Sequence, residues 1–159
     1  MNISPLDVSD TDILVGALTV WGEARGDTQE GRTAVAHTIL NRCKAQSWYG
    51  KGNGEDLKDH TISAVCLKPM QFSCWNEKDP NRKTLTKMLS AGWSSIAYKD
   101  FRACLKALTD ALDGFAKDQT AGATHYLTTT LHNTSKAPEW SKRGDYIEIG
   151  AHRFFKGVK

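Results

Sequence analysis

The stretch Trp21-Gly22-Glu23-Ala24-Arg25-Gly26-Asp27 lies where the first amphipathic segment of the chain ends. Before it, Ser9-Asp10-Thr11-Asp12 has the S-x-x-D form of a capping box, and apolar residues follow at helical spacing. This pattern predicts a first helix over residues 11–24, which Gly26 ends. Glu23 therefore lies at the corner between this helix and the next one.

Glu23 is the candidate acid of the chain, because it stands between the aromatic side chain of Trp21 and a turn. A glutamate buried against an aromatic ring has its charged form disfavoured. Its pKa then rises, which suits it to general acid work at neutral pH. The alternative is an exposed helix glutamate, which needs no such neighbours.

The remaining segments predict a mainly helical chain with a late β element. Further helices are expected from a cap at Asp27 or Thr28 to Lys44, from Thr61 to Leu67 and from Ser94 to Leu112, with one or two helical turns from Lys83 to Leu89. A loop with two exposed aromatic residues is expected over 46–59, an ordered non-helical segment over 70–76, a strand over 123–127, a loop over 133–140 and a hairpin over 146–155 around Gly150. The fold class is therefore α+β, mainly α, with a small C-terminal β element in one domain over residues 1–159.

Composition narrows the classes of partner. Lysine and arginine total 21 against 18 aspartates and glutamates, so the net charge is +3. This is far from the basic stripe of a dedicated nucleic-acid binder, and we expect no nucleic-acid partner, although anionic polymers such as cell walls remain compatible. No apolar run is long enough to span a membrane, so no membrane insertion is expected.

The four cysteines show no metal-site spacing. Cys43, Cys66, Cys74 and Cys104 are far apart, without a C-x-x-C pair. A buried reduced thiol behaves as a small hydrophobe, which is the interpretation we favour for each of them. Three disulfide pairings and full reduction stay open.

Four further segments accompany the stretch around Glu23 in order along the chain. They are Glu30-Gly31-Arg32-Thr33-Ala34-Val35-Ala36 with Leu40-Asn41-Arg42, then Pro69-Met70-Gln71-Phe72-Ser73, then Gly122-Ala123-Thr124-His125-Tyr126, and finally Ile149-Gly150-Ala151-His152-Arg153-Phe154-Phe155. Each motif is weak alone, but their order over nearly the whole chain is specific. Together they resemble the spore cortex-lytic (SleB-type) family of cell-wall hydrolases.

This resemblance implies a lysozyme-like fold and cleavage of peptidoglycan glycan strands between N-acetylmuramic acid and N-acetylglucosamine. Members act as muramidases or as lytic transglycosylases, which leave an anhydro sugar. The family's catalytic glutamate lies in a G-E-A-R-G motif, which Glu23 matches without departure. No cofactor and no metal are implied, since protonation needs only protein groups.

Other site residues follow with less direct support. Asp27 and Glu30 are candidates for a second carboxylate, but the start of the second helix explains both, which favours a single-acid mechanism. Candidate substrate-binding residues are Gln71, Ser73, Tyr126, His125 and Asn133. His152 is interpreted as structural, and Trp48, Trp75, Trp93 and Trp140 as either core residues or saccharide platforms.

Three competing functions are kept. A metal-dependent amidase or peptidase would use His37, His60, His125, His132 and His152, although no H-E-x-x-H spacing is present. A cysteine endopeptidase would use Cys66 or Cys74 with His125 as base. A non-catalytic wall-binding module would make Glu23 incidental.

The start of the chain suggests a biological setting. Residues 1–10 contain no basic segment followed by an apolar one, so we expect no secretory signal. A bacteriophage endolysin fits this better than an exported spore protein. We expect such a protein to accumulate as a monomer in the host cytoplasm and to act on the wall after a membrane lesion forms.

Overall fold

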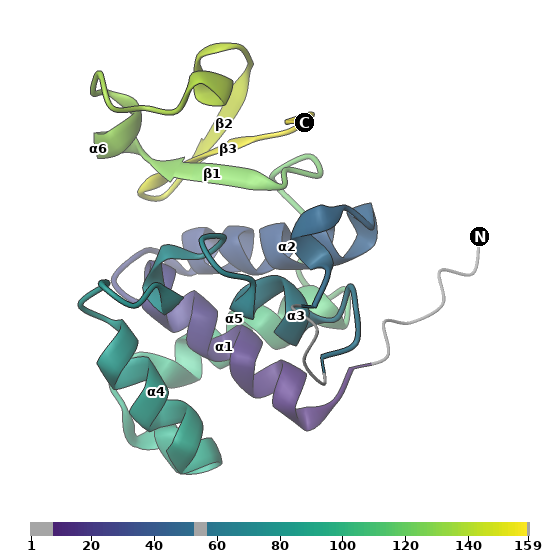
Figure 1. Cartoon of the computed structure of the whole chain (residues 1–159), viewed down its shortest axis with the longest axis vertical. Coiled ribbons are helices and arrows are strands. Elements are labelled where there is room, and N and C mark those ends of the chain that lie inside the picture. Colours follow the sequence, from purple (N-terminus) through teal and green to yellow (C-terminus); the bar gives the residue numbers. More distant parts are fainter. Residues whose placement is uncertain (1–7, 53–56, 159) are drawn as a thin grey trace.

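The computed structural model describes residues 8–52 and 57–158, with a helical body and a small sheet lying to one side of it (Figure 1). The helices are α1 (Asp10–Ala24), α2 (Gln29–Ala45), α3 (Ile62–Leu67), α4 (Arg82–Ala91), α5 (Phe101–Leu112) and α6 (Thr129–His132). Short 3-10 helices are η1 (Trp48–Gly50), η2 (Ser73–Trp75), η3 (Gly92–Ala97) and η4 (Glu139–Lys142). The strands are β1 (His125–Thr128), β2 (Tyr146–Ile149) and β3 (His152–Phe155).

Helix α1 is the centre of the helical body. The predicted capping box is confirmed, because Ser9 caps the Asp12 N–H while the Asp12 carboxylate accepts from the Ser9 N–H. From residue 14 to residue 21 every residue of α1 is buried, and the helix packs against α5, α3 and α2. Helix α1 is therefore a core helix, and Glu23 lies on its last turn, just beyond the buried run.

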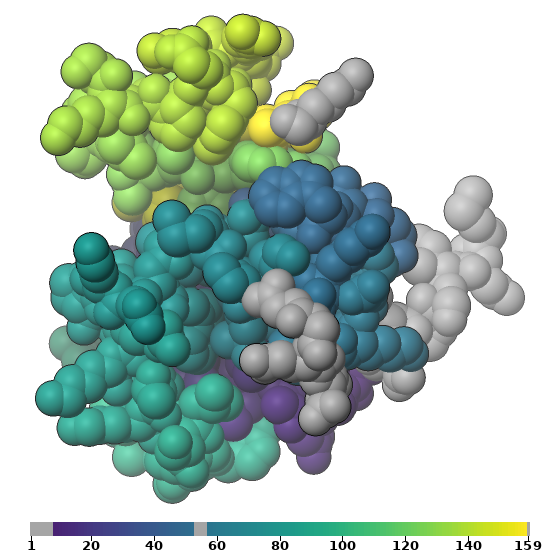
Figure 2. Space-filling view, in the orientation of Figure 1, coloured from purple at the N-terminus to yellow at the C-terminus, as the bar shows by residue number. Residues whose placement is uncertain are grey.

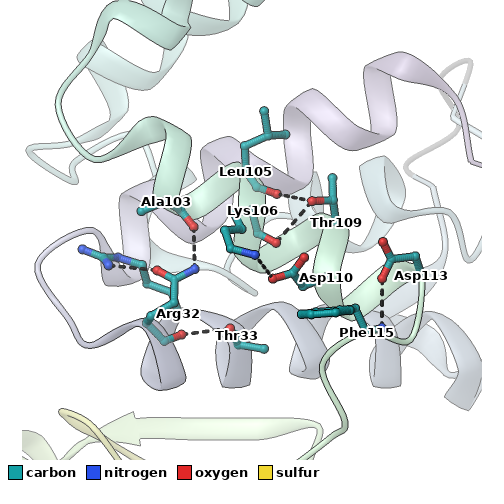
Figure 3. A network of polar contacts seen from close by, with 10 residues as sticks. Arg32, Thr33, Ala103, Leu105, Lys106, Thr109, Asp110, Asp113 and Phe115 are labelled. Carbon is teal, nitrogen blue, oxygen red and sulfur yellow. Dashed lines mark hydrogen bonds and ion pairs between the residues drawn. The ribbon is translucent and has the colours of Figure 1, made fainter.

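Helices α2 and α5 are joined by polar contacts at their surface as well as by apolar packing. The Gln29 amide donates to the Ala103 carbonyl oxygen at 3.0 Å, and Arg32 Nη1 donates to the Gln29 side-chain oxygen (Figure 3). Arg32 Nη2 also donates to the Arg25 carbonyl oxygen in the turn after α1. These contacts hold the corner between α1 and α2 against α5.

The sheet has the order β1-β3-β2 with antiparallel pairs, and the predicted hairpin over 146–155 is confirmed. Its two faces differ because strand side chains alternate. On the face toward the helices, Tyr126 contacts His152 and Phe154. On the other face, Leu127 and Phe155 form a small second core beneath the segment that carries η4. In Figure 2 this C-terminal part stands as a yellow-green lobe beside the helical body.

The structure corrects the predictions for three segments, and one of these is 70–76, which was expected to be non-helical but contains η2. The helix predicted from Ser94 begins only at Phe101, because η3 is followed by a turn in which Asp100 has φ = 66°. The Trp21 indole holds this turn by donating to the Lys99 carbonyl oxygen. In the predicted loop 46–59, Trp48 is exposed as expected, but Tyr49 is buried.

The favoured interpretation of the cysteines as buried reduced thiols agrees with the structure. All four cysteines are free and buried. No helix within residues 8–52 and 57–158 is long and apolar enough to cross a membrane. The expectations for residues 1–7 and for 53–56 of the loop concern positions outside the described residues.

Candidate active site

Glu23 lies on the last turn of α1, directly against η2. Its Oε1 accepts a hydrogen bond from the Cys74 backbone N–H at 3.3 Å. This approach depends on Gly22, because a Cβ there would lie 2.7 Å from the Cys74 Cβ and 2.8 Å from its Sγ. The glycine of the G-E pair therefore allows η2 to reach the acid.

The surroundings of Glu23 favour its protonated form. Burial raises the pKa of Glu23, and the negative charge of Asp79 raises it further. Hydrogen bonds from the backbone and thiol of Cys74 and from the Tyr126 hydroxyl lower the pKa, but the net shift is upward. Burial also raises the pKa of the Cys74 thiol and of Tyr126, so both stay protonated as donors. The site suits a proton donor.

The aromatic neighbour of Glu23 is Tyr126 rather than Trp21, which corrects the sequence interpretation. The Trp21 ring stacks under the Arg25 guanidinium, packs edge-on against Tyr98 and donates to the Lys99 carbonyl. Residues two apart on a helix point in different directions. Trp21 therefore faces the α5 side while Glu23 faces η2 and the sheet.

Two adjoining hollows meet at Glu23. One, of about 270 Å³, is lined by Glu23, Arg42, Met70, Gln71, Ser73, Tyr126, Leu127, Thr128, Leu131 and His152. The other, of about 470 Å³, is lined by residues 22–27, Asn81, Thr128, Ala151 and His152. They share Glu23, Thr128 and His152, and we call the two together the Glu23 cleft. Three predicted substrate-binding residues, Gln71, Ser73 and Tyr126, line it with Glu23.

The other two predicted substrate-binding residues do not line the cleft. His125 precedes Tyr126 on β1, so its ring lies on the opposite face, against Tyr49 and Trp140. Burial and the positive charge of Arg42 lower the pKa of His125 to about 4. Asn133 is exposed beyond α6, where its side-chain oxygen accepts from Arg153. The motif over residues 122–126 placed His125 near the site, but strand alternation takes it to the opposite face.

Neither candidate second carboxylate is free to act beside Glu23. Both Asp27 carboxylate oxygens accept from the Ala151 N–H, one accepts from Thr28, and the other lies 3.2 Å from His152 Nδ1. Gly150 permits this approach, because it has φ = 57° and a Cβ there would collide with the Asp27 carboxylate. Asp27 thus anchors the hairpin turn, whereas the sequence had explained it by the start of the second helix, which Thr28 caps. Glu30 is exposed in the first turn of α2 and is absent from the walls of the cleft.

Arg42 is a cleft residue that the sequence indicated only as part of a motif. Its guanidinium is buried, lies 4.6 Å from the centre of the Phe72 ring, and donates from Nε to the Thr124 carbonyl oxygen. Nη1 is buried without a hydrogen-bond partner. Burial lowers the pKa of Arg42, and the charge of Glu23 is among the groups that raise it. A buried cation near a carboxyl group stabilises the ionised form of that group.

The described residues give no support to the metal or cysteine alternatives. No group of three or more histidine, cysteine or acidic side chains within residues 8–52 and 57–158 is placed to hold a metal ion. Cys66 and Cys74 are buried, and burial raises the pKa of both thiols, which disfavours the reactive thiolate. The ring of His125, the proposed base, lies against Tyr49 and Trp140.

The sequence and the fold of the chain are similar to those of known cell-wall enzymes. A family model described as Cell Wall Hydrolase matches residues 26–155. The catalytic domain of the germination-specific lytic transglycosylase SleB from Bacillus anthracis is 27% identical, with a TM-score of 0.62 over 96% of this chain and 99% of that one. The catalytic domain of the Bacillus cereus SleB protein is 26% identical, with the same TM-score over 98% of both chains. These structures confirm the predicted mainly helical fold with a C-terminal sheet.

Full-length relatives are longer than this chain. The spore cortex-lytic enzyme of Halalkalibacterium halodurans is 29% identical over 150 residues, which are 94% of this chain and 36% of the relative. That of Oceanobacillus iheyensis is 36% identical over 97 residues, 56% of this chain and 31% of the relative. The chain thus spans about a third of the length of these curated relatives.

Proposed function

The chain belongs to the cell wall hydrolase family, and on that premise we propose that it cleaves the glycan strand of peptidoglycan between N-acetylmuramic acid and N-acetylglucosamine. The observation that carries the proposal is the position of Glu23, a carboxyl group of raised pKa where two hollows meet. The solved catalytic domain of similar length and fold, described as a lytic transglycosylase, supports the same class of reaction.

In the proposed mechanism the Glu23 carboxyl transfers its proton to the glycosidic oxygen as the bond from that oxygen to the anomeric carbon breaks. Positive charge then develops on the sugar ring while Glu23 becomes a carboxylate. This carboxylate is stabilised by hydrogen bonds from Cys74 and Tyr126 and by the positive charge of Arg42. Gln71 and Ser73 are proposed to hold the sugar through hydrogen bonds at the cleft wall.

A lytic transglycosylase reaction, which uses one catalytic acid, fits the proposed site better than hydrolysis that needs two carboxylates. Asp27 is the carboxylate besides Glu23 on the walls of the cleft, and its oxygens are already occupied by the hairpin turn. In a single-acid reaction, a hydroxyl of the same muramic acid attacks the anomeric carbon. That hydroxyl gives its proton back to Glu23, which yields an anhydro sugar and restores the acid.

Mass spectrometry of fragments released from purified peptidoglycan tests this proposal. We expect anhydromuramic ends from the wild-type protein and none from Glu23→Gln, which keeps the shape of the side chain but cannot donate the proton. Fragments with reducing ends would instead indicate that the enzyme is a hydrolase and not a transglycosylase. Cut stem peptides, or full activity in Glu23→Gln, would overturn the assignment.

Three further measurements test the competing functions. Activity that survives exhaustive chelation excludes a metal enzyme. Wall lysis that survives thiol blocking, while Glu23→Gln abolishes it, excludes a cysteine nucleophile. Binding to purified sacculi without any released fragment would instead support a non-catalytic wall-binding module.

The setting proposed from the sequence is that of a monomeric bacteriophage endolysin. It would accumulate in the host cytoplasm and reach the wall through a membrane lesion made by another protein. Expression inside a bacterium tests this role. We expect lysis only when a membrane-permeabilising protein is produced together with it. Lysis without such a protein would contradict the role, and light scattering of the purified chain tests the monomeric state.

A further inference from the structure

A third hollow, of about 590 Å³, adjoins the Glu23 cleft. Its walls come from the end of α3, the segment around η2 and α4, and are formed by Leu67, Pro69, Met70, Trp75, Asn76, Glu77, Arg82, Thr86 and Leu89. We call it the α4 groove. Met70 lines both the groove and the Glu23 cleft. A ligand lying along the cleft can therefore extend past Met70 into the groove.

Met70 has two unusual features at this junction. Its φ of 68° is in the left-handed region, which is rare for a bulky side chain other than at special sites. The residue is also 77% exposed, although methionine is usually buried. A flexible thioether side chain held out between two hollows is suited to contact a ligand that passes between them.

The groove walls are better matched to a peptide than to sugars. Leu67, Pro69 and Leu89 give aliphatic surface. The Trp75 indole, which would be the natural platform for a sugar ring, is 9% exposed, and its N–H is already donated to Thr19. A sugar ring would stack on an exposed aromatic face, which Trp75 does not offer, whereas methyl-bearing peptide residues pack on aliphatic walls.

The groove also carries one charged group of each sign. Glu77 is exposed, and Arg82, whose Nη1 donates to the Trp75 carbonyl oxygen, begins α4. An acidic or zwitterionic peptide can place its carboxylate toward the guanidinium and an ammonium group toward Glu77. This combination of an aliphatic wall and two opposite charges matches a short peptide with small side chains and ionised groups.

We propose that the α4 groove binds the peptide stem that peptidoglycan carries on its muramic acid residues. The proposal rests on the proposed glycan-cleaving function, because the stem leaves the sugar next to the bond that Glu23 would cleave. A muramic acid bound at Gln71 and Ser73 then directs its peptide over Met70 into the groove. The enzyme would thus recognise peptide-bearing strands in preference to bare glycan.

A blocking substitution tests this inference. Thr86 is exposed on α4 and lines the groove, while Lys87 is its exposed neighbour outside the groove walls. Thr86→Trp fills the groove, and Lys87→Trp adds the same ring elsewhere as a matched control. The rate of each is measured on peptidoglycan and on the same strands after an amidase has removed the peptides. Thermal denaturation checks that both variants fold.

We expect Thr86→Trp to lower kcat/KM on peptide-bearing strands by about tenfold, equivalent to about 1.4 kcal/mol of lost binding, and to leave bare strands unaffected. Lys87→Trp should change neither rate. An equal fall on both substrates would assign the groove to the glycan and overturn the proposal. No fall on either would also overturn it.

Binding of a synthetic stem peptide to Glu23→Gln, followed by NMR, separates this inference from the proposed function. Shifts at groove residues that disappear in the Glu23→Gln, Thr86→Trp double variant are expected. Absence of glycan cleavage by the wild type with this binding intact would sink the proposed function and leave the groove as a peptide site. Glycan cleavage without any peptide binding at the groove would overturn this inference and leave the proposed function intact.

Discussion

The two glycines of the stretch around Glu23 should respond very differently to alanine. At Gly22 a Cβ would lie 2.7 Å from the Cys74 Cβ and 3.0 Å from Leu85 Cδ1, well inside the separation of about 3.5–4.0 Å at which carbon atoms pack. At Gly26 a Cβ would meet nothing within 4 Å. The same change thus tests a crowded and an open position four residues apart.

The expected magnitude for Gly22→Ala follows from these contacts. Overpacking costs about 1–3 kcal/mol, and the better helix propensity of alanine offsets about 1 kcal/mol of this. The net loss of up to about 2 kcal/mol lowers Tm by up to about 8 °C. Activity should fall further, by about 100-fold, because relief of the clash moves Cys74 from Glu23 by about 1 Å. Gly26→Ala should keep wild-type Tm and activity.

Thermal denaturation and the rate of fragment release from purified peptidoglycan measure both effects. Adding Cys74→Gly to Gly22→Ala removes two of the three crowded atoms, so the stability effects of the two changes should be non-additive. A Gly22→Ala protein with unchanged Tm and rate would refute the argued contact between α1 and η2. Equal damage from Gly26→Ala would show that the crowding at Gly22 is not the cause.

Three further predictions concern the surroundings of the site. Asp27→Ala removes the acceptor of the hairpin N–H groups and should cost about 2–3 kcal/mol of stability. At low temperature the folded Asp27→Ala protein should remain far more active than Glu23→Gln. Equal inactivation of the two variants would give Asp27 a chemical role. His125 has a folded-state pKa of about 4 against about 6.5 when unfolded, so the unfolded chain takes up its proton first and stability falls as pH drops from about 6.5 to 4. In His125→Gln, Tm should fall less steeply over this range, and an unchanged slope would count against the neutral buried ring. Thiol reagents should modify the native protein slowly, because all four cysteines are buried and the pKa values of Cys43 and Cys104 are raised to about 12; rapid labelling before unfolding would contradict this burial.

Local features of the fold followed from the sequence because their causes are local. The capping box at Ser9, the end of α1 near Gly26 and the hairpin around Gly150 depend on residues within a few positions of one another. The start of α5 was predicted wrongly. Its position depends on a hydrogen bond from the Trp21 indole N–H to the Lys99 carbonyl oxygen, and these two residues are 78 positions apart in the chain.

The sequence by itself determined the helical class and the late sheet, and it made Glu23 the candidate acid, since periodicity, caps and an ordered set of motifs are present along the chain. Tertiary structure alone decided what surrounds that acid. The aromatic neighbour of Glu23 is Tyr126 and not Trp21, because side chains two residues apart on a helix point in different directions. Tyr126 comes from the distant strand β1, which packs beside Glu23. The tertiary structure also turned His125 to the far face of the sheet, because adjacent residues of a strand point to opposite sides.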